Sequence, residues 1–201
     1  MKKVYLDSAA TTSLDPQILK IMQPYFSEKF GNPSEFHSLG QEAKKAIEEA
    51  RGKLARFLNA APDEIYFTGS ATESINLSHK GLIETQKSKL KNQNLPHIIT
   101  SQIEHKAVLE TCAHLEKLGW ARVTYLPVNK GGLVLLEEIK KSIKAETVLV
   151  SIMYVNNEVG TIQSIAEIGQ FLKKINKQRT MNHKPRIFFH TDATGYPIPG
   201  L

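Results

Sequence analysis

Four separate stretches of the chain carry side chains that could together hold a phosphorylated aromatic ring. They are residues 68–74, His105, Asn157 and Asp192. The first combines a glycine with hydroxyl side chains where a helix is expected to start, and the free N–H groups of a helix start bind phosphate. A neutral imidazole can stack on a flat ring, and an acid behind an apolar strand needs a positive partner, such as a protonated pyridine nitrogen. Asn157 adds an amide that could reach a ring oxygen or a substrate carboxylate.

Each stretch also has an ordinary structural interpretation. Ser70 or Thr72 could cap the helix, and Asn157 could form a turn. Asp192 could be a surface acid or a cap, and a lone histidine is more often structural than functional. No Gly-Lys-Ser/Thr follows Gly69, so the stretch is not a P-loop. The ligand-binding interpretation therefore depends on whether the fold brings the stretches together.

Helical and strand periodicities alternate along most of the chain. We expect a helix opened by Asp15-Pro16 and further helices over residues 41–58, 71–89, 105–118, 136–143 and 164–177. We expect strands over residues 64–68, 97–100, 123–126, 147–153 and 186–191. This order predicts an α/β fold with a mostly parallel sheet and helices on both faces. Ligands of such sheets gather at the carboxyl ends of the strands, where all four stretches are expected to lie.

Composition indicates an ordinary globular protein. The 201 residues are 41% hydrophobic and 23% charged, and no apolar run approaches the ~20 residues of a membrane span. A single cysteine, Cys112, excludes an internal disulfide and favours a cytoplasmic location. The net charge of +6 is concentrated partly in residues 87–91 and 173–186. Neither stretch interleaves aromatic residues, so we expect solvated surface and no direct nucleic-acid contact, and no residue pattern indicates a metal site.

Six segments extend these observations to most of the chain. They are residues 5–12, 31–34, 68–76, 98–109, 148–160 and 190–194. In these segments the chain resembles the N-terminal half of pyridoxal-phosphate-dependent cysteine desulfurases, within the class V aminotransferases. Glu104-His105-Lys106 together with residues 155–158 resembles the branch that serves iron–sulfur cluster assembly.

The resemblance implies a role for each candidate residue. Ala71 and Thr72 would contact the cofactor phosphate, His105 would stack on the pyridine ring as the catalytic candidate, Asn157 would lie beside cofactor and substrate, and Asp192 would pair with the pyridine nitrogen. The implied reaction removes sulfur from L-cysteine, leaving alanine and an enzyme persulfide for iron–sulfur clusters or tRNA thiolation.

The resemblance also implies an architecture and partners. The family is a homodimer that delivers sulfur to acceptor or scaffold proteins. Residues 1–201 would be an N-terminal segment plus most of the cofactor-binding large domain, a type I fold, without the smaller C-terminal domain.

The chain departs from the family pattern mainly at its end. Ser8 replaces an Asn, and Gly195 stands where the family has a Gln. The covalent Schiff-base lysine, the nucleophilic cysteine and the carboxylate-binding arginine are expected further on, so we expect this polypeptide to bind the cofactor weakly and not to turn over. Residues 78–81 mimic the lysine motif but fall within a helix, and Cys112 is expected to be a core thiol. A frameshift near codon 194 would explain the unfamiliar tail.

Two other functions stay open. The chain could be a non-catalytic binding or regulatory module derived from a desulfurase, although retention of the candidate ring-binding residues argues against this. It could also belong to a different enzyme of the same fold, such as an aminotransferase, against which the full run of motifs argues.

Overall fold

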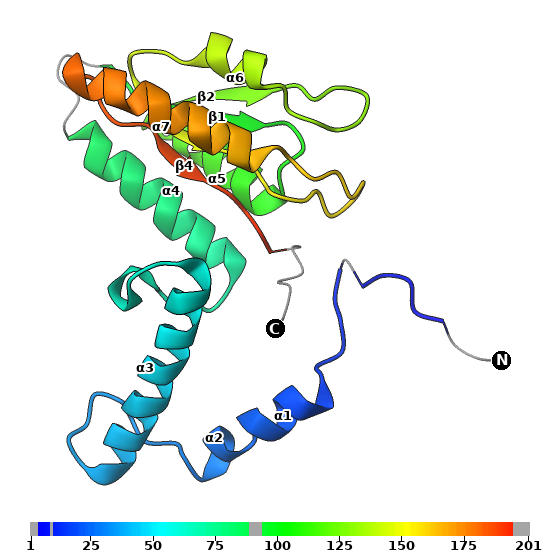
Figure 1. Ribbon diagram of the computed structural model, residues 1–201, viewed down its shortest axis with the longest axis vertical. Helices are drawn as coiled ribbons and strands as arrows, with labels where there is room; N and C mark the ends of the chain where they lie inside the picture. The colour runs from blue at the N-terminus through cyan, green and yellow to red at the C-terminus, as the bar shows by residue number, and fades with distance from the viewer. Residues whose placement is uncertain (1–3, 9, 89–93, 195–201) are drawn as a thin grey trace. The chain divides into compact units, whose positions relative to one another are not determined.

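The computed structural model describes residues 4–8, 10–88 and 94–194 (Figure 1). The chain divides into two compact units, Met1–Thr68 and Gly69–Leu201. Gly195 and the rest of the tail lie outside the described residues, as do residues 89–91 of the first basic stretch.

The first unit contains helices α1 (Pro16–Met22), α2 (Pro24–Ser27) and α3 (Ser38–Leu58), followed by a short 3-10 helix, η1 (Pro62–Glu64). Asp15 caps α1, because its Oδ1 accepts the Gln17 N–H at 2.7 Å and Pro16 occupies the first turn. The helix start predicted at Asp15-Pro16 is thus confirmed, and α3 begins three residues before its predicted start.

The strand predicted over residues 64–68 is wrong. Glu64 ends η1, and residues 65–68 join no sheet in the part of the chain that the structure describes. The Ile65 carbonyl instead accepts a hydrogen bond from the Arg51 guanidinium, which lies 4.9 Å from the centre of the Phe67 ring. The β-branched and aromatic composition suits a strand, but a strand is stable only beside a hydrogen-bonded neighbour.

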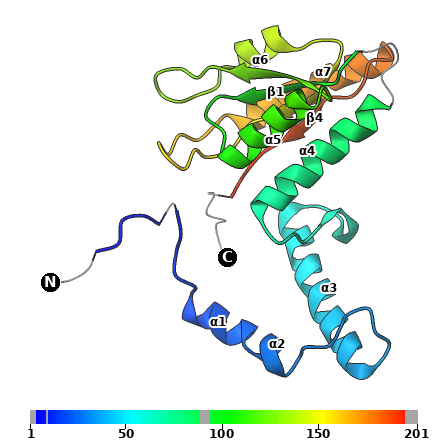
Figure 2. The same cartoon turned by 180° about the vertical axis from the view of Figure 1, so that it is seen from behind.

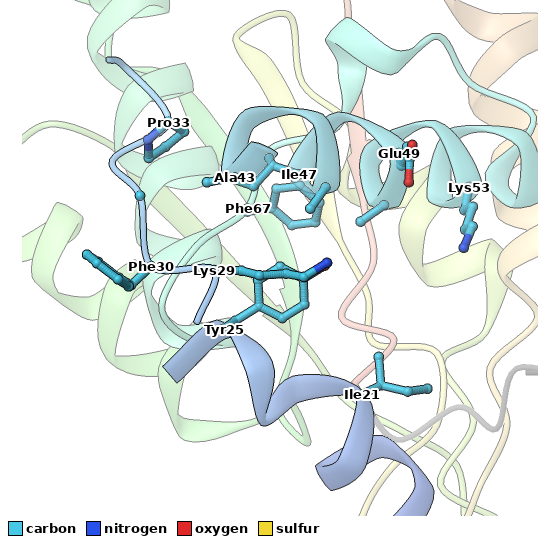
Figure 3. Close-up of a pocket in the computed structure, with 13 residues that line it drawn as sticks. Ile21, Tyr25, Lys29, Phe30, Pro33, Ala43, Ile47, Glu49, Lys53 and Phe67 are labelled. Atoms are coloured by element: carbon cyan, nitrogen blue, oxygen red, sulfur yellow. The ribbon is translucent and has the colours of Figure 1, made fainter. Parts of the chain in front are cut away.

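The first unit also contains an apolar cavity of about 760 Å³ (Figure 3). Its lining includes Ile21, Tyr25, Phe30, Ile47 and Phe67. None of the residues predicted to bind a cofactor lines it.

The second unit contains four helices that follow the predicted order: α4 (Ala71–Lys87), α5 (Lys106–Lys117), α6 (Leu136–Ser142) and α7 (Ile165–Met181). Its strands are β1 (His97–Ser101), β2 (Arg122–Leu126), β3 (Thr147–Ser151) and β4 (Phe188–His190). They form a parallel sheet in the order β2-β1-β3-β4, with Ile98 opposite Val123 on one side and Leu149 on the other. The carboxyl ends of all four strands therefore share one edge.

Two hydrophobic clusters cover the two faces of this sheet. Ile98 of β1 packs with α4 and α5 through residues such as Ile83 and Val108, whereas the next residue, Ile99, packs with α6 and α7. The views from opposite sides show α7 in front of the sheet in Figure 1 and α5 in front in Figure 2. The predicted α/β fold with helices on both faces is confirmed. Cys112 of α5 is fully buried, so its prediction as a core thiol is confirmed.

The second basic stretch is only partly solvated surface, which corrects the sequence prediction. The helix expected to end at Lys177 continues to Met181, and Arg179 in its last turn is buried. Its guanidinium donates to the carbonyl oxygens of Pro185, Lys144, Ala145 and Thr147 at 2.8–3.0 Å. A buried guanidinium is tolerated because its donors are satisfied, so Arg179 connects the end of α7 to the segment before β3.

Within the described ranges, no helix has the length and apolar character of a membrane span.

Candidate cofactor site

The loops that follow β1, β3 and β4 form one edge of the second unit. Backbone hydrogen bonds extend the pairing of β3 and β4 into the segments that follow these strands: Ile152 N–H donates to His190 O at 3.1 Å, and Tyr154 N–H donates to Asp192 O at 2.8 Å. Because β1, β3 and β4 are neighbours in the sheet, the loops carrying His105, Asn157 and Asp192 lie next to one another.

The start of α4 is capped and also keeps free donors. Ser70 is the N-cap, and its Oγ accepts the Glu73 N–H at 3.1 Å, while Glu73 Oε2 accepts the Gly69 N–H at 2.7 Å. Ser70 therefore has the capping role that the sequence left open. Among the described residues, the N–H groups of Ala71 and Thr72 have no protein acceptor, and both residues are exposed. Two donors at a helix N-terminus are thus available to an external anion.

His105, predicted as the first residue of a helix, is instead the N-cap of α5, which begins one residue later at Lys106. Its Nδ1 accepts the Ala107 N–H at 3.1 Å, which places the proton of the neutral ring on Nε2. The ring is exposed and lines a cavity of about 370 Å³ together with Thr72, Asn76 and Lys80. The structure thus brings the predicted phosphate residue Thr72 and the predicted stacking residue His105 to one cavity.

Asn157 and Asp192 lie on the neighbouring loops and do not line that cavity. Asn157 is exposed, and its Nδ2 donates to Glu158 Oε1 at 3.2 Å. Asp192 is half-buried, and its Oδ1 accepts the N–H of Thr194 at 3.0 Å and the Thr194 hydroxyl at 2.6 Å. These short-range bonds fix the carboxylate at the end of β4.

Glu104 is a buried acid that reasoning from the sequence missed. Its Oε1 accepts the Ser101 hydroxyl at 2.7 Å and the Met153 N–H at 2.9 Å, and its Oε2 is buried without a partner in the described part of the chain. Burial, opposed by the hydrogen bonds from Met153 and Ser101 and aided by the nearby Asp192 carboxylate, raises the pKa of this carboxyl to about 7. The sequence does show an acid between the end of a strand and the start of a helix, but Glu104 was used only as part of the resemblance to the family.

A second network that the sequence did not indicate joins His79 of α4, Ser151 of β3 and His190 of β4. Ser151 Oγ lies 3.1 Å from His79 Nε2 and 2.9 Å from His190 Nδ1, and His79 Nδ1 lies 3.0 Å from the Ile75 carbonyl oxygen. The two imidazole rings meet edge to face, with centroids 4.6 Å apart. Burial, with a contribution from His190, lowers the pKa of His79 to about 4, so the network is neutral at pH 7. The stretch 78–81 therefore supplies a core histidine, while its Lys80 borders the cavity.

The donor set along this edge fits a phosphorylated pyridine. Free N–H groups at the start of α4 suit a phosphate, the exposed ring of His105 suits a flat aromatic face, and the fixed Asp192 carboxylate suits a protonated ring nitrogen. Residues 69–74, His105, Asn157 and Asp192 thus all belong to the second unit.

Comparison with known proteins identifies a family and several similar sequences. The family described as aminotransferase class-V matches residues 4–181. A cysteine desulfurase IscS of Dictyoglomus turgidum is 46% identical over 192 residues, which cover 96% of this chain and 45% of the relative. A mitosomal cysteine desulfurase of Trachipleistophora hominis is 48% identical over 192 residues, which cover 95% of this chain and 40% of that relative. The chain therefore spans about half the length of these relatives.

Solved structures agree in fold. A structure titled NifS-like protein superposes with a TM-score of 0.85 at 43% identity, covering 96% of this chain and 49% of that one. The structure titled SspA in complex with cysteine superposes with a TM-score of 0.84 at 40% identity, covering 96% of this chain and 51% of that one. Since the family match covers most of the sequence and the parallel sheet agrees with it, this chain belongs to the aminotransferase class-V family.

Proposed function

We propose that this chain forms the cofactor-binding half of a pyridoxal-phosphate-dependent cysteine desulfurase, which removes sulfur from L-cysteine and leaves alanine and an enzyme persulfide. The observation that carries the proposal is similarity to a cysteine desulfurase at 46% identity over 96% of the chain. The polar groups on the loops at the carboxyl edge of the sheet suit the parts of the cofactor.

In this proposal each candidate residue has a distinct task. The N–H groups of Ala71 and Thr72 bind the phosphate, and His105 covers one face of the ring. Asn157 donates to the ring oxygen or to the substrate carboxylate. Asp192 accepts from the pyridine nitrogen and keeps it protonated. When bound, pyridoxal phosphate supplies the electron sink for bond cleavage in the amino acid.

His105 also has the atom needed to move a proton. Its Nδ1 is engaged by the Ala107 N–H, so Nε2 is the ring nitrogen left for exchange with a ligand. Its exposure at the cavity gives that nitrogen access to a reacting group. We therefore propose His105 as the catalytic residue of this half of the site.

The finer assignments are part of the same proposal. L-cysteine as substrate is supported by the likeness to SspA, whose structure was solved with cysteine. Sulfur delivery to an acceptor or scaffold protein for iron–sulfur cluster assembly or tRNA thiolation, assembly as a homodimer and a cytoplasmic location are inferred from likeness to the IscS relatives and from the single cysteine.

Titration of the purified chain with pyridoxal phosphate, followed by visible circular dichroism, tests the proposal. We expect an induced signal with the wild type. We expect the affinity for pyridoxal phosphate to fall at least about tenfold in Asp192→Ala, because the ring nitrogen would lose its charged partner. Asp63→Ala in the first unit is the matched control. Absence of any induced signal, or equal affinity in both variants, would refute the assignment.

Alanine release from L-cysteine then separates catalysis from binding. Cofactor binding without alanine release by this polypeptide would favour a non-catalytic module or a half-site that needs further sequence. A signal with other amino acids and none with L-cysteine would favour a different enzyme of the family.

A further inference from the structure

The two loops that carry His105 and Asn157 are tied to each other by two hydrogen bonds. We call residues 102–105 the His105 loop and residues 152–160 the Asn157 loop. Glu104 Oε1 of the first loop accepts the N–H of Met153 in the second at 2.9 Å. In the opposite direction, Asn156 Nδ2 donates to the Ile103 carbonyl oxygen at 2.9 Å. Each loop thus supplies one side chain that holds the backbone of the other.

Both tying side chains are built into the interior. Glu104 and Asn156 are each 5% exposed. Glu104 Oε1 also accepts the Ser101 hydroxyl at the end of β1. Asn156 Oδ1 accepts the N–H groups of Glu158 and Val159 at 3.0 and 2.9 Å, which shapes its own loop. Each side chain therefore has one set of contacts to nearby residues of its own segment and one contact to the backbone of the other loop.

The residue that follows each tying residue is exposed and belongs to the candidate site. Glu104 precedes His105, and Asn156 precedes Asn157. Because a backbone anchored at one residue constrains the next, a shift of either tying side chain would move the neighbouring ring or amide. Pairs of a buried anchor and an exposed functional side chain on both loops point to a shared positioning role.

We propose that Glu104 and Asn156 are positioning residues that lock the two loops into one unit, so that the His105 imidazole and the Asn157 amide face the ligand at a fixed spacing. The inference rests on the proposed function only for the nature of the ligand. A ligand that meets two loops already held together does not have to order them, so less binding free energy is lost.

The chemistry of the two side chains provides selective variants. Glu104→Gln keeps an Oε1 that can accept from Ser101 and Met153 and places an amide where the unpartnered Oε2 lies. Glu104→Leu removes the acceptor and leaves the Met153 N–H buried without a partner. Asn156→Asp keeps the Oδ1 acceptor for the N–H groups of its own loop and removes the Nδ2 donor to the Ile103 carbonyl and to Met153 Sδ.

Amide hydrogen exchange, measured by mass spectrometry on peptides covering the two loops, tests the proposal without any cofactor. Loss of one cross-loop bond is expected to speed exchange about tenfold in both loops, for Glu104→Leu and for Asn156→Asp alike. Glu104→Gln is expected to exchange like the wild type. Ile139→Ala, which removes a fully buried side chain of α6, controls for a general loss of stability and is expected to leave the two loops no faster than the rest of the unit.

Three results would overturn the proposal: faster exchange confined to the loop that carries the substitution, equal behaviour of Glu104→Gln and Glu104→Leu, or the same pattern in Ile139→Ala. If Glu104→Leu does not fold, Asn156→Asp decides whether faster exchange is confined to one loop, because it retains the acceptor for the backbone N–H groups of Glu158 and Val159.

A titration with pyridoxal phosphate supplies an independent readout. We expect Glu104→Leu and Asn156→Asp each to weaken binding about tenfold with an altered circular dichroism band, and Glu104→Gln to restore both. If the wild type itself shows no binding, the proposed function fails, while hydrogen exchange still decides whether the two loops move as one unit.

Discussion

The free energy of unfolding is expected to depend on pH through Glu104, and substitution by glutamine isolates this dependence. Burial raises the pKa of the Glu104 carboxyl from 4.5 to about 7, the hydrogen bonds from Met153 and Ser101 oppose the rise, and Asp192 adds to it. An acid whose pKa is higher in the folded state binds its proton more tightly there. Its ionisation therefore destabilises the fold progressively as the pH rises from 4.5 through 7.

The size of the effect follows from the two pKa values. Each pH unit between them corresponds to about 1.4 kcal/mol, so the charged carboxylate costs about 3 kcal/mol above pH 7. Glutamine does not ionise and keeps the Oε1 acceptor. We therefore expect the stability of Glu104→Gln relative to wild type to increase by about 2 to 3 kcal/mol between pH 5 and pH 8.

Urea unfolding followed by the fluorescence of Trp120 measures this difference. Trp120 is the one tryptophan of the chain, and it belongs to the same unit as Glu104. Buried histidines such as His79 titrate in both proteins, so their contribution cancels in the difference. Glu84→Gln on the exposed side of α4 is the matched control and is expected to show no change with pH. A difference between Glu104→Gln and wild type that stays constant from pH 5 to pH 8 would refute the reasoning.

Three other buried groups give further predictions. Burial lowers the pKa of His79 to about 4, so the stability contributed by its neutral form is lost as the pH falls from 6.5 toward 4. In urea unfolding we expect the wild type to lose about 2 kcal/mol more than His79→Gln between pH 7 and pH 5. The exposed variant His114→Gln is the control and is expected to behave as the wild type. Arg179→Met leaves four backbone carbonyls without their donor and is expected to cost about 3 kcal/mol by the same assay, whereas exposed Lys177→Met should cost under about 0.5 kcal/mol. Burial raises the pKa of the Cys112 thiol to about 12, so we expect no reaction with a thiol-specific disulfide reagent at pH 8 until urea unfolds the second unit; rapid labelling of the native protein would contradict the buried position.

Much of the fold could be predicted from short windows of the sequence. Apolar residues at helical spacing marked α3 and α5, and Asp15 and Ser70 marked the first residues of α1 and α4 because a cap bonds only to its own first turn. The strand predicted over residues 147–153 contains the apolar run Val148–Val150, and the structure buries β3 along its whole length, with residues in both hydrophobic clusters. The parallel order then followed from strands alternating with helices.

The structural roles of other residues depend on contacts that no short window contains. The stretch 64–68 has the composition of a strand but no partner strand in the described part of the chain, and pairing is a property of two segments. Arg179 was read as surface because its charge is visible in the sequence, whereas the carbonyls that hold it lie up to 35 residues away. Glu104 is held by Met153, 49 residues later, and Asn156 by Ile103, 53 residues earlier. Residue type and local spacing thus indicated which side chains could bind a ligand, whereas the packing of distant segments decided which acids and amides are buried and able to position them.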